Sequence, residues 1–372
     1  MRTFVFTCLL LLGMTTFAQD ANFHIYLCLG QSNMEGNAKV EEQDTVAVDS
    51  RFQVLAAVDC SNLGRTKGNW YKAVPPLARC YTGLTPGDYF GRAMVANLPS
   101  NVRVGIINVA VGGCRIELFD KDNYQSYVET SPDWLKNMVK EYGGNPYARL
   151  VEMAKLAQKD GVIKGILLHQ GESNTNDKDW PLKVKGVYDN LLNDLGLSAV
   201  NVPLLAGEVV HADQNGVCAS MNTIIDSLPQ VIPTAHVISS AGCPAAFDNL
   251  HFTAEGYRML GARYAAKMLS ILGYGDWTSA QNMKLWYNRP AQDWLEALPL
   301  GNSRLGAMVF GGTAREELQL NEETFWAGGP YNNNNPKGLQ VLPEIRRLIF
   351  EGKTLEAQKL IDENYMTPQH GM

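Results

Sequence analysis

The sequence has few charged residues and no excess of basic ones. Only 19% of its 372 residues are charged, and 32 Lys and Arg stand against 38 Asp and Glu, which gives a formal net charge of −6. Nucleic acids and anionic lipid surfaces bind proteins mainly through clustered basic side chains. We therefore expect no nucleic-acid partner and no attachment to a membrane surface through charge.

Glycine and proline are not enriched either, at 34 and 17 residues. Their ordinary frequencies exclude collagen-like and low-complexity chains. Hydrophobic residues make up 45% of the sequence, which is enough for a full core and too much for an intrinsically disordered chain. A chain of this length is typical of about two domains.

The sequence also lacks the usual metal-binding patterns. It contains no CxxC pair, no Cys/His cluster and no HExxH motif, which are the spacings that hold zinc and related ions. His169 follows an apolar run, but no second histidine lies near it in the sequence. We therefore expect neither a metal nor another cofactor.

No apolar run beyond the first 18 residues is long enough to predict a membrane span. Residues 1–18 indicate a secretory signal peptide, because Arg2 supplies a positive charge, residues 5–14 are apolar, and small residues precede the end of the segment at Ala18. Cys8 lies inside the apolar run, which disfavours a lipid anchor. The sequence predicts a secreted or periplasmic protein without a membrane anchor.

Six cysteines follow residue 18, and six cysteines allow 15 pairings. An exported protein can form disulfides. Cys28 lies in an apolar run, and we expect it to remain a buried thiol. Two further pairs each flank a loop-rich stretch and are expected to form disulfides, Cys60 with Cys80 and Cys218 with Cys243.

Through the first 272 residues, short apolar runs alternate with helical patterns. The expected strands are residues 23–29, 102–109, 162–168, 202–206 and 235–239. The expected helices are residues 88–97, 147–159, 180–195, 221–228 and 253–272. This alternation predicts an α/β fold, a five-stranded parallel sheet with helices on both faces. The stretch from 36 to 87 is expected to be irregular.

Residues 273–284 indicate a linker, beyond which the alternation stops. Residues 285–287, 307–310 and 317–320 predict short strands. Residues 342–364 carry an apolar stripe at helical spacing and predict one long helix. We therefore expect a second, β-rich and incomplete segment that contains one long helix.

Parallel sheets place their functional sites at the carboxyl ends of strands, so the residues after each expected strand are the candidates. Ser32 follows the first strand at a turn into a helix, which exposes its hydroxyl and directs its own N–H toward a possible oxyanion. Gly113 follows the second strand in a glycine pair that lets the backbone approach a ligand. Taken alone, Ser32 could be a plain helix cap and Gly113 an ordinary turn residue.

Two more pairs of candidates follow the third and fifth strands. After the third, Glu172 offers a carboxylate and Gln170 offers a neutral N–H donor, which can stabilise an oxyanion without titrating. After the fifth, Asp248 and His251 are three residues apart, so the carboxylate can hold Nδ1 of the histidine and leave Nε2 free as a general base. The alternative for this second pair is a capping aspartate beside a packed histidine.

Together these residues predict a serine hydrolase site. Ser32 is the expected nucleophile, His251 the base and Asp248 its acidic partner. The backbone N–H groups of Ser32 and Gly113 and the side chain of Gln170 are the expected oxyanion hole. The serine lacks the G-x-S-x-G pattern, which disfavours an ordinary α/β-hydrolase.

Four blocks of the sequence resemble, in order, those of the SGNH hydrolases, and more narrowly carbohydrate esterase family 6 with the related sialate O-acetylesterase domain. The matching blocks are Gly30-Gln31-Ser32-Asn33-Met34, Gly112-Gly113, His169-Gln170-Gly171-Glu172 and the run from Asp248 to His251. The resemblance covers about residues 22–272 and implies a flavodoxin-like sheet with a serine esterase site. In some members of this group the third block supplies the acidic partner, so Glu172 competes with Asp248 for that role.

Residues 285–372 resemble the beginning of glycoside hydrolase family 95, which contains α-L-fucosidases and α-L-galactosidases. The matching runs are Leu285 to Pro290, Leu298 to Asn302 and Leu320 to Trp326. In that family the catalytic carboxylates lie in a later helical barrel, which this sequence does not contain. The segment is thus expected to be a partial N-terminal domain without fucosidase activity.

The resemblances imply an exported esterase that removes O-acetyl groups from polysaccharide or glycan, with an acetylated carbohydrate as its substrate partner. One alternative has the same chemistry on another sugar, a sialate O-acetylesterase. An alternative of another class is a non-catalytic carbohydrate-binding protein, which would not need the complete set of Ser32, Gln170, Asp248 and His251.

Overall fold

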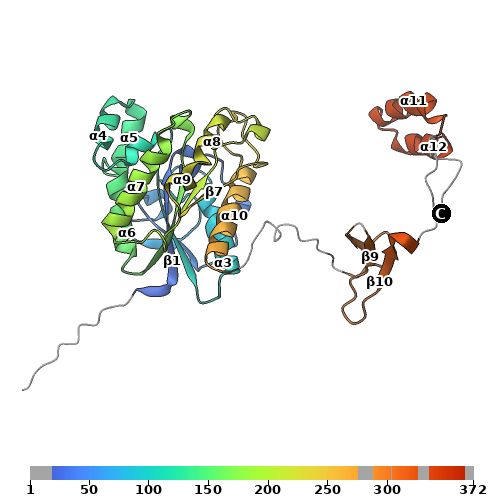
Figure 1. Cartoon of the computed structure of the whole chain (residues 1–372), viewed down its shortest axis with the longest axis horizontal. Helices are drawn as coiled ribbons and strands as arrows, with labels where there is room; N and C mark the ends of the chain where they lie inside the picture. The colour runs from blue at the N-terminus through green and yellow to red at the C-terminus, as the bar shows by residue number, and fades with distance from the viewer. Residues whose placement is uncertain (1–18, 275–286, 288, 303, 326–334, 365–372) are drawn as a thin grey trace, which may run out of the picture. The chain divides into compact units, whose positions relative to one another are not determined.

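The computed structural model describes residues 19–274, 287, 289–302, 304–325 and 335–364. The chain divides into two compact units, residues 1–284 and residues 285–372, each of which is described by itself (Figure 1). The expected signal peptide and all but two residues of the expected linker lie outside the described residues.

The first unit is built on a seven-stranded sheet in the order β3-β2-β4-β1-β5-β6-β7. Its strands are β1 (Asp20–Gly30), β2 (Phe52–Leu55), β3 (Trp70–Lys72), β4 (Arg103–Ala110), β5 (Gly161–His169), β6 (Leu204–Gly207) and β7 (Ala235–Ile238). All neighbouring strands are parallel except β3, which runs antiparallel to β2. The central strand β1 has Leu27 in register with Ile107 of β4 and with Ile166 of β5.

The expectation of five strands is therefore corrected to seven. The five expected strands are present, and their order, β4-β1-β5-β6-β7, is the one found in flavodoxin-like sheets. The two additional strands, β2 and β3, lie within the stretch from 36 to 87 that was expected to be irregular. They contain only four and three residues, and they form because β2 pairs with β4 and β3 pairs with β2 at the edge of the sheet.

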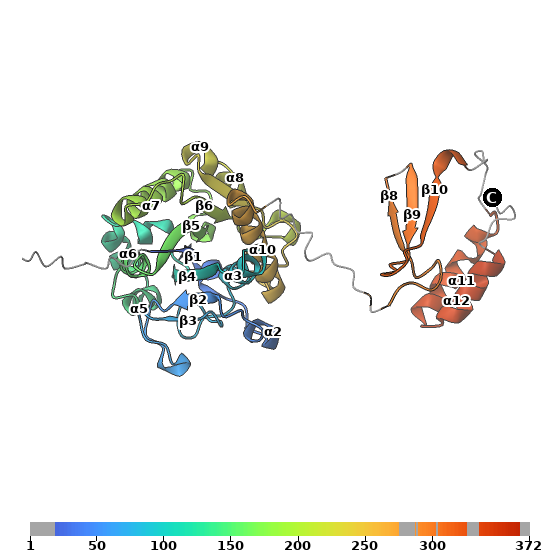
Figure 2. The same ribbon diagram turned by 90° about the horizontal axis from the view of Figure 1, so that it is seen from below.

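Helices cover both faces of this sheet (Figure 2). Residues of β1 alternate between two apolar clusters, with Leu27 and Leu29 in one and Tyr26 and Cys28 in the other. The helices are α1 (Ser32–Glu35), α2 (Glu42–Thr45), α3 (Pro86–Asn97), α4 (Tyr124–Thr130), α5 (Asp133–Glu141), α6 (Pro146–Ala157), α7 (Trp180–Leu195), α8 (Asn222–Ile225), α9 (Leu228–Val231) and α10 (Ala254–Ile271). The first cluster includes residues of α6 and α7, and the second includes residues of α3 and α10.

Local sequence explains where the longer helices begin. The side chain of Thr85 accepts a hydrogen bond from the N–H of Gly87 and forms a capping box with Asp88, and Pro86 occupies the first turn of α3. The side chain of Thr253 accepts a hydrogen bond from the N–H of Gly256 and caps α10, as its position in the sequence predicts. Short 3-10 helices fill several turns: η1 (Ser61–Leu63), η2 (Ile116–Phe119), η3 (Glu172–Asn174), η4 (Ala212–Gln214) and η5 (Ala219–Met221).

One of the two expected disulfides is present. Cys60 and Cys80 are bonded, which closes the loop that contains η1 and β3. Cys218 and Cys243 are free thiols, so the second expected bridge is wrong. Spacing in the sequence carries no information about which two sulfur atoms meet in the fold. Cys28 is a buried thiol, as predicted.

The second unit contains a three-stranded antiparallel sheet and a pair of helices. Its elements are β8 (Leu298–Gly301), β9 (Leu305–Val309), β10 (Leu318–Glu322), η7 (Glu323–Phe325), α11 (Gly338–Phe350) and α12 (Thr354–Asn364). The one long helix expected at 342–364 is wrong, because the chain turns between α11 and α12 at Gly352, whose φ is 74°. Strand β8 was not predicted, and the strand expected at residues 285–287 falls outside the described residues except for Tyr287.

Among the described residues, no helix is both long enough and apolar enough to cross a membrane.

Candidate active site

The carboxyl ends of β1, β4 and β5 meet at the point where the strand order reverses, which is where parallel sheets of this kind bind ligands. Ser32 is the first residue of α1 and follows β1 after the buried Gln31. Gly113 follows β4, and Gln170 and Glu172 follow β5. The fold thus brings to one edge three blocks that are spread over about 140 residues of sequence.

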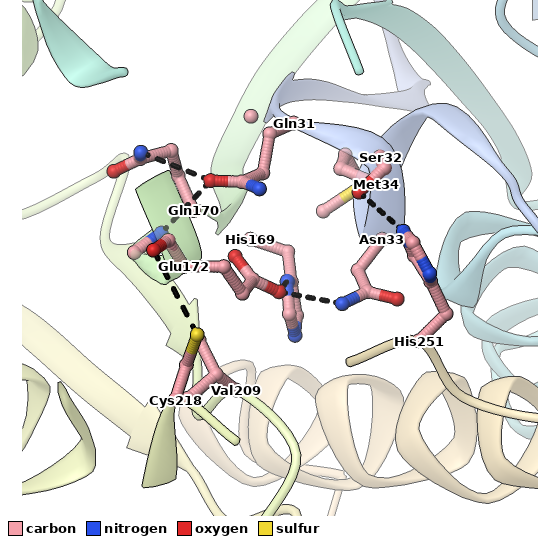
Figure 3. Close-up of polar contacts among 12 residues, drawn as sticks. Gln31, Ser32, Asn33, Met34, His169, Gln170, Glu172, Val209, Cys218 and His251 are labelled. Atoms are coloured by element: carbon pink, nitrogen blue, oxygen red, sulfur yellow. Dashed lines mark hydrogen bonds and ion pairs between the residues drawn. The ribbon is translucent and has the colours of Figure 1, made fainter. Parts of the chain in front are cut away.

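His251 joins the nucleophile candidate to a carboxylate. Figure 3 shows the His251 ring directed at Ser32, and its Nε2 lies 2.9 Å from the Oγ of Ser32. Its Nδ1 lies 2.7 Å from Oδ2 of Asp248. The other carboxylate oxygen of Asp248 accepts the backbone N–H groups of Leu250 and His251, both at 3.0 Å. The three-residue spacing therefore closes a tight turn in which one carboxylate fixes both the backbone and the ring of the histidine.

The surroundings of Asp248 favour its charged form. Burial raises the pKa of this carboxyl, but the hydrogen bonds from the His251 ring and from the two backbone N–H groups outweigh burial and hold the pKa below its usual value. An ionised Asp248 keeps the proton of the neutral ring on Nδ1 and leaves Nε2 as the acceptor that faces Ser32.

Glu172 has no hydrogen bond to His251 in the structure. Its Oε1 accepts the side-chain N–H of Asn33 at 2.5 Å and lies 3.8 Å from Nδ1 of His169. Its Oε2 is buried and has no hydrogen-bond partner among the described residues. Of the two candidate carboxylates, Asp248 thus contacts His251, whereas Glu172 contacts Asn33, the residue after Ser32.

His169 is completely buried, and Nε2 of its ring lies 2.9 Å from the backbone oxygen of Glu208. Burial lowers the pKa of this histidine, which favours its neutral form. Within the described part of the chain, no group of three or more metal-binding side chains comes together. His169 is therefore a packed core histidine beside the site.

Asn33 is a structural link that the sequence reasoning did not single out. Its side-chain nitrogen donates to Glu172 and also to the backbone oxygen of Leu250 at 3.1 Å, and its oxygen accepts the Tyr257 hydroxyl at 2.6 Å. Asn33 is fully buried, so it ties the nucleophile turn to the loop that carries His251. Its place next to Ser32 in the first sequence block was the available signal.

Two backbone N–H groups beside Ser32 are free to bind an oxyanion. Those of Ser32 and Gly113 have no acceptor among the described residues. Gly113 has a φ of 71°, a left-handed conformation that glycine adopts without strain. The preceding residue, Gly112, lies against the side chain of Glu35, whose Oε2 is 2.9 Å from the position that a Cβ on Gly112 would take.

Gln170, the third expected oxyanion donor, is engaged elsewhere. Its side-chain nitrogen donates to Asn174 at 2.7 Å, Gln31 at 3.1 Å and the Cys114 backbone oxygen at 3.2 Å. Its oxygen accepts the indole N–H of Trp180, and the residue is 1% exposed. An amide nitrogen carries two hydrogens, so no donor is left over in this arrangement. An oxyanion role for Gln170 stays a prediction that would require this network to rearrange.

A serine, a histidine and an aspartate joined in this way, beside free backbone N–H groups at the edge of a parallel sheet, form the constellation of a serine hydrolase. Residues 22–270 match the family model described as carbohydrate esterase, sialic acid-specific acetylesterase. The chain belongs to this family, as the resemblance in its sequence blocks predicted, and it is a carbohydrate O-acetylesterase by that membership.

Individual relatives agree with this assignment. A probable carbohydrate esterase of Arabidopsis thaliana is 25% identical over 261 residues, which is 66% of this chain and 90% of that protein. A solved structure of an Arabidopsis thaliana protein superposes with a TM-score of 0.52 at 21% identity, covering 68% of this chain and 99% of the other. The crystal structure of NanS gives a TM-score of 0.51 at 14% identity, covering 69% and 99%. The two structures show a common fold.

The second unit has different relatives. Residues 285–371 match the model described as glycosyl hydrolase family 65, N-terminal domain. Alpha-L-fucosidase 2 of Arabidopsis thaliana is 43% identical over 75 residues, which is 20% of this chain and 9% of that protein. The chain thus spans about a tenth of the length of the fucosidases that it matches. The predicted likeness to fucosidases is confirmed, and it is restricted to this small C-terminal part.

Proposed function

We propose that this protein is an exported serine esterase that removes O-acetyl groups from polysaccharide or glycan hydroxyls through an acyl-serine intermediate. The observation that carries the proposal is the continuous hydrogen-bonded chain from Ser32 through His251 to Asp248. A non-catalytic binding protein would not require a nucleophile, a base and an orienting carboxylate in this geometry.

The geometry supports a two-step reaction. In the first step Oγ of Ser32 attacks the acetyl carbonyl carbon while Nε2 of His251 takes the hydroxyl proton. The histidine then gives this proton to the sugar oxygen, which leaves as an alcohol and leaves acetyl on the serine. In the second step water loses a proton to Nε2 and attacks the acetyl carbon, and the serine regains a proton as acetate leaves.

The N–H groups of Ser32 and Gly113 support the charged intermediate of each step. A carbonyl oxygen becomes negatively charged when the carbon turns tetrahedral, and fixed donors that face that oxygen need no reorganisation as the charge develops. Both N–H groups lack other acceptors among the described residues, so binding an oxyanion would break no hydrogen bond that the structure contains.

An exposed aromatic ring next to Gly113 offers a surface on which a sugar can pack. The indole ring of Trp134 lies 2.7 Å from the position that a Cβ on Gly113 would take, and the residue is 53% exposed. Aromatic rings offer a flat apolar face against which the C–H groups of a pyranose can pack, and this packing needs no charge on the sugar.

Charge beside the same loop favours a neutral substrate. Arg115, two residues after Gly113, has its guanidinium 3.4 Å from Glu117 and 3.7 Å from Asp177. Lys183 pairs with the same two carboxylates at 2.9 Å and 2.6 Å. Both cations are already neutralised, which supports an acetylated neutral polysaccharide over a sugar acid. The fucosidase-like second unit supports the same substrate class, since acetyl groups on branched glycans hinder glycosidases.

A sialate O-acetylesterase is the second candidate, because the matching family model is described as sialic acid-specific. The chemistry at Ser32 would be identical, and only the sugar would differ.

Two features support export. The first 18 residues have the pattern of a signal peptide. The disulfide between Cys60 and Cys80 is of a kind that persists in oxidising compartments and is rare in the cytosol.

The test is acetate release by the purified protein, with acetylated xylan or xyloglucan compared with 9-O-acetyl sialic acid, and with p-nitrophenyl acetate as a small reference ester. We expect release from the polysaccharide to be faster. The Ser32→Ala and His251→Ala variants should lower kcat by about 10³ or more, because the residues of a triad act as a unit. Faster release from the sialate would favour the second candidate, and an unchanged rate in either variant would contradict the acyl-serine mechanism.

A further inference from the structure

A buried ion pair lies next to the loop Gly112-Gly113, which carries one of the expected oxyanion donors. Glu35 is the last residue of α1, and its Oε1 accepts from Arg79 Nε at 3.1 Å and from Nη2 at 2.6 Å. The two side chains are only 10% and 12% exposed. Removing one partner of such a pair leaves an uncompensated charge away from water, so the two groups hold each other in one position.

The same carboxylate holds the first glycine of the loop. Burial raises the pKa of Glu35, and the backbone N–H of Gly112 acts against this effect and lowers it. Oε2 of Glu35 lies 2.9 Å from the position that a Cβ on Gly112 would take, so a side chain at 112 would displace the carboxylate. Glycine at 112 therefore permits the close approach of Glu35, while the left-handed φ is found at the next residue, Gly113.

We propose that Glu35, fixed by Arg79, is a positioning residue for the oxyanion hole. Its carboxylate packs against Gly112, and this contact fixes the peptide from which the chain turns, so that the next N–H, that of Gly113, stays free for the substrate. A glycine pair has few steric restraints of its own, so without this anchor the loop can rotate and the donor loses its alignment. The inference rests on the proposed function, since it concerns the same oxyanion hole.

Arg79 also supplies a matched control. Its Nη1 lies 2.5 Å from Oε1 of Glu141, a second carboxylate on α5 whose side chain is 44% exposed. No hydrogen bond joins Glu141 to the backbone of Gly112 or Gly113 among the described residues. A change at Glu141 thus alters the charge balance around the same arginine without touching the loop.

The experiment compares Glu35→Gln with Glu141→Gln in the full chain, with p-nitrophenyl acetate as the substrate and thermal unfolding as the measure of folding. Glutamine has the size of glutamate, but it is neutral and carries an NH2 group in place of one carboxylate oxygen. It therefore pairs less strongly with Arg79 and does not present two oxygens to Arg79 and Gly112. We expect Glu35→Gln to lower kcat by about 10- to 100-fold with KM within about twofold, because the donor acts on the developing charge and not on the bound ester. Glu141→Gln should keep kcat within about twofold, because Glu141 is exposed and water can replace its contact with Arg79.

Three outcomes would overturn the inference: an unchanged kcat in folded Glu35→Gln, an equal loss in both variants, or a loss confined to KM. If Glu35→Gln does not fold, Arg79→Lys can be tested in its place, because lysine keeps the positive charge but cannot make the two-nitrogen contact with Glu35. The kcat of Arg79→Lys should fall about 5- to 10-fold at constant KM. A wild-type kcat in folded Arg79→Lys would equally overturn the inference. Ser32→Ala separates the two proposals. If it stays active, the proposed function fails and the inference with it, whereas an inactive Ser32→Ala beside a fully active Glu35→Gln refutes the inference alone.

Discussion

At the scale of single residues, two acidic side chains lie close to the nucleophile and have different partners. Asp248 accepts Nδ1–H of His251, while Glu172 accepts the side-chain N–H of Asn33. The first contact sets the tautomer of His251, and the second stabilises the turn that contains Ser32 and Asn33. Their replacement should therefore have unequal consequences.

We expect Asp248→Asn to lower kcat by about 10³ to 10⁴, because an amide can hold the ring in the wrong tautomer. Glu172→Gln should cost much less, since the glutamine oxygen can still accept from Asn33. Steady-state kinetics on p-nitrophenyl acetate, with a Tm for each variant, would measure both effects. If Glu172→Gln were the more damaging change, the acidic role would pass to Glu172.

At the scale of elements, the start of α3 depends on a buried carboxylate. Asp88 is 1% exposed, its Oδ2 accepts the backbone N–H of Thr85 at 2.9 Å, and its Oδ1 has no partner among the described residues. Burial raises the pKa of Asp88 to about 8, and the hydrogen bond from Thr85 and the charge of Arg92 oppose this only in part. In the folded protein Asp88 thus keeps its proton through the neutral range, which an unfolded aspartate does not.

The direction of the pH effect follows from proton binding. Between the unfolded pKa near 3.8 and the folded pKa near 8, the folded state binds the extra proton, so this group favours folding less and less as the pH rises through that window. An asparagine at this position does not titrate, so it would not lose stability as the pH rises, and its amide oxygen could still accept the N–H of Thr85. We expect Asp88→Asn to gain stability relative to wild type between pH 5 and pH 8, by about 2–4 °C in Tm for each kcal/mol of difference.

Differential scanning calorimetry at the two pH values would check this, with Asp248→Asn as a control because the pKa of that carboxyl is lowered and not raised. A difference in Tm between Asp88→Asn and wild type that did not change with pH would mean that Asp88 is ionised in the fold.

At the scale of the whole molecule, the two units differ in how much apolar surface they bury. The first has two extended clusters of buried residues on the faces of its sheet. The second has one small cluster, Ile345, Leu348 and Ala357. Large apolar side chains of the second unit remain mostly exposed: Leu300, Leu320, Leu339, Phe350 and Leu355. Short strands with exposed edges and so little core give limited stability.

We therefore expect limited proteolysis to cut near residues 273–284 or within the second unit, and to leave a stable core of roughly 250 residues, which is an ordinary size for one domain. The core should retain full esterase activity, and the intact chain should release no fucose from a fucosyl substrate. Mass spectrometry of the fragments and a rate assay before and after digestion would test this. A protease-resistant second unit, or loss of esterase activity with its removal, would show that it is integral to the fold.

The sequence was sufficient for features that local pattern controls. The five expected strands, the bounds of α7 at residues 180–195 and the cap at Thr253 follow from periodicity and from capping chemistry within a few residues. The approximate site follows as well, because a parallel sheet collects the residues after its strands at one edge. Spacing alone made Asp248 the closer partner for His251, since three residues are enough to close that turn.

The remaining features depend on atoms that are distant in the sequence. The pairing of β2 with β4 and of β3 with β2 depends on which surfaces meet after the chain folds. The bond of Cys60 to Cys80 but not of Cys218 to Cys243, and the turn at Gly352, depend on this as well. So do the burial of the Gln170 amide in its own network and the support of Gly112 by Glu35 and Arg79. A sequence pattern reports which chemical groups are present, whereas only the packed structure decides which of their hydrogen bonds are already used and which remain free for a substrate.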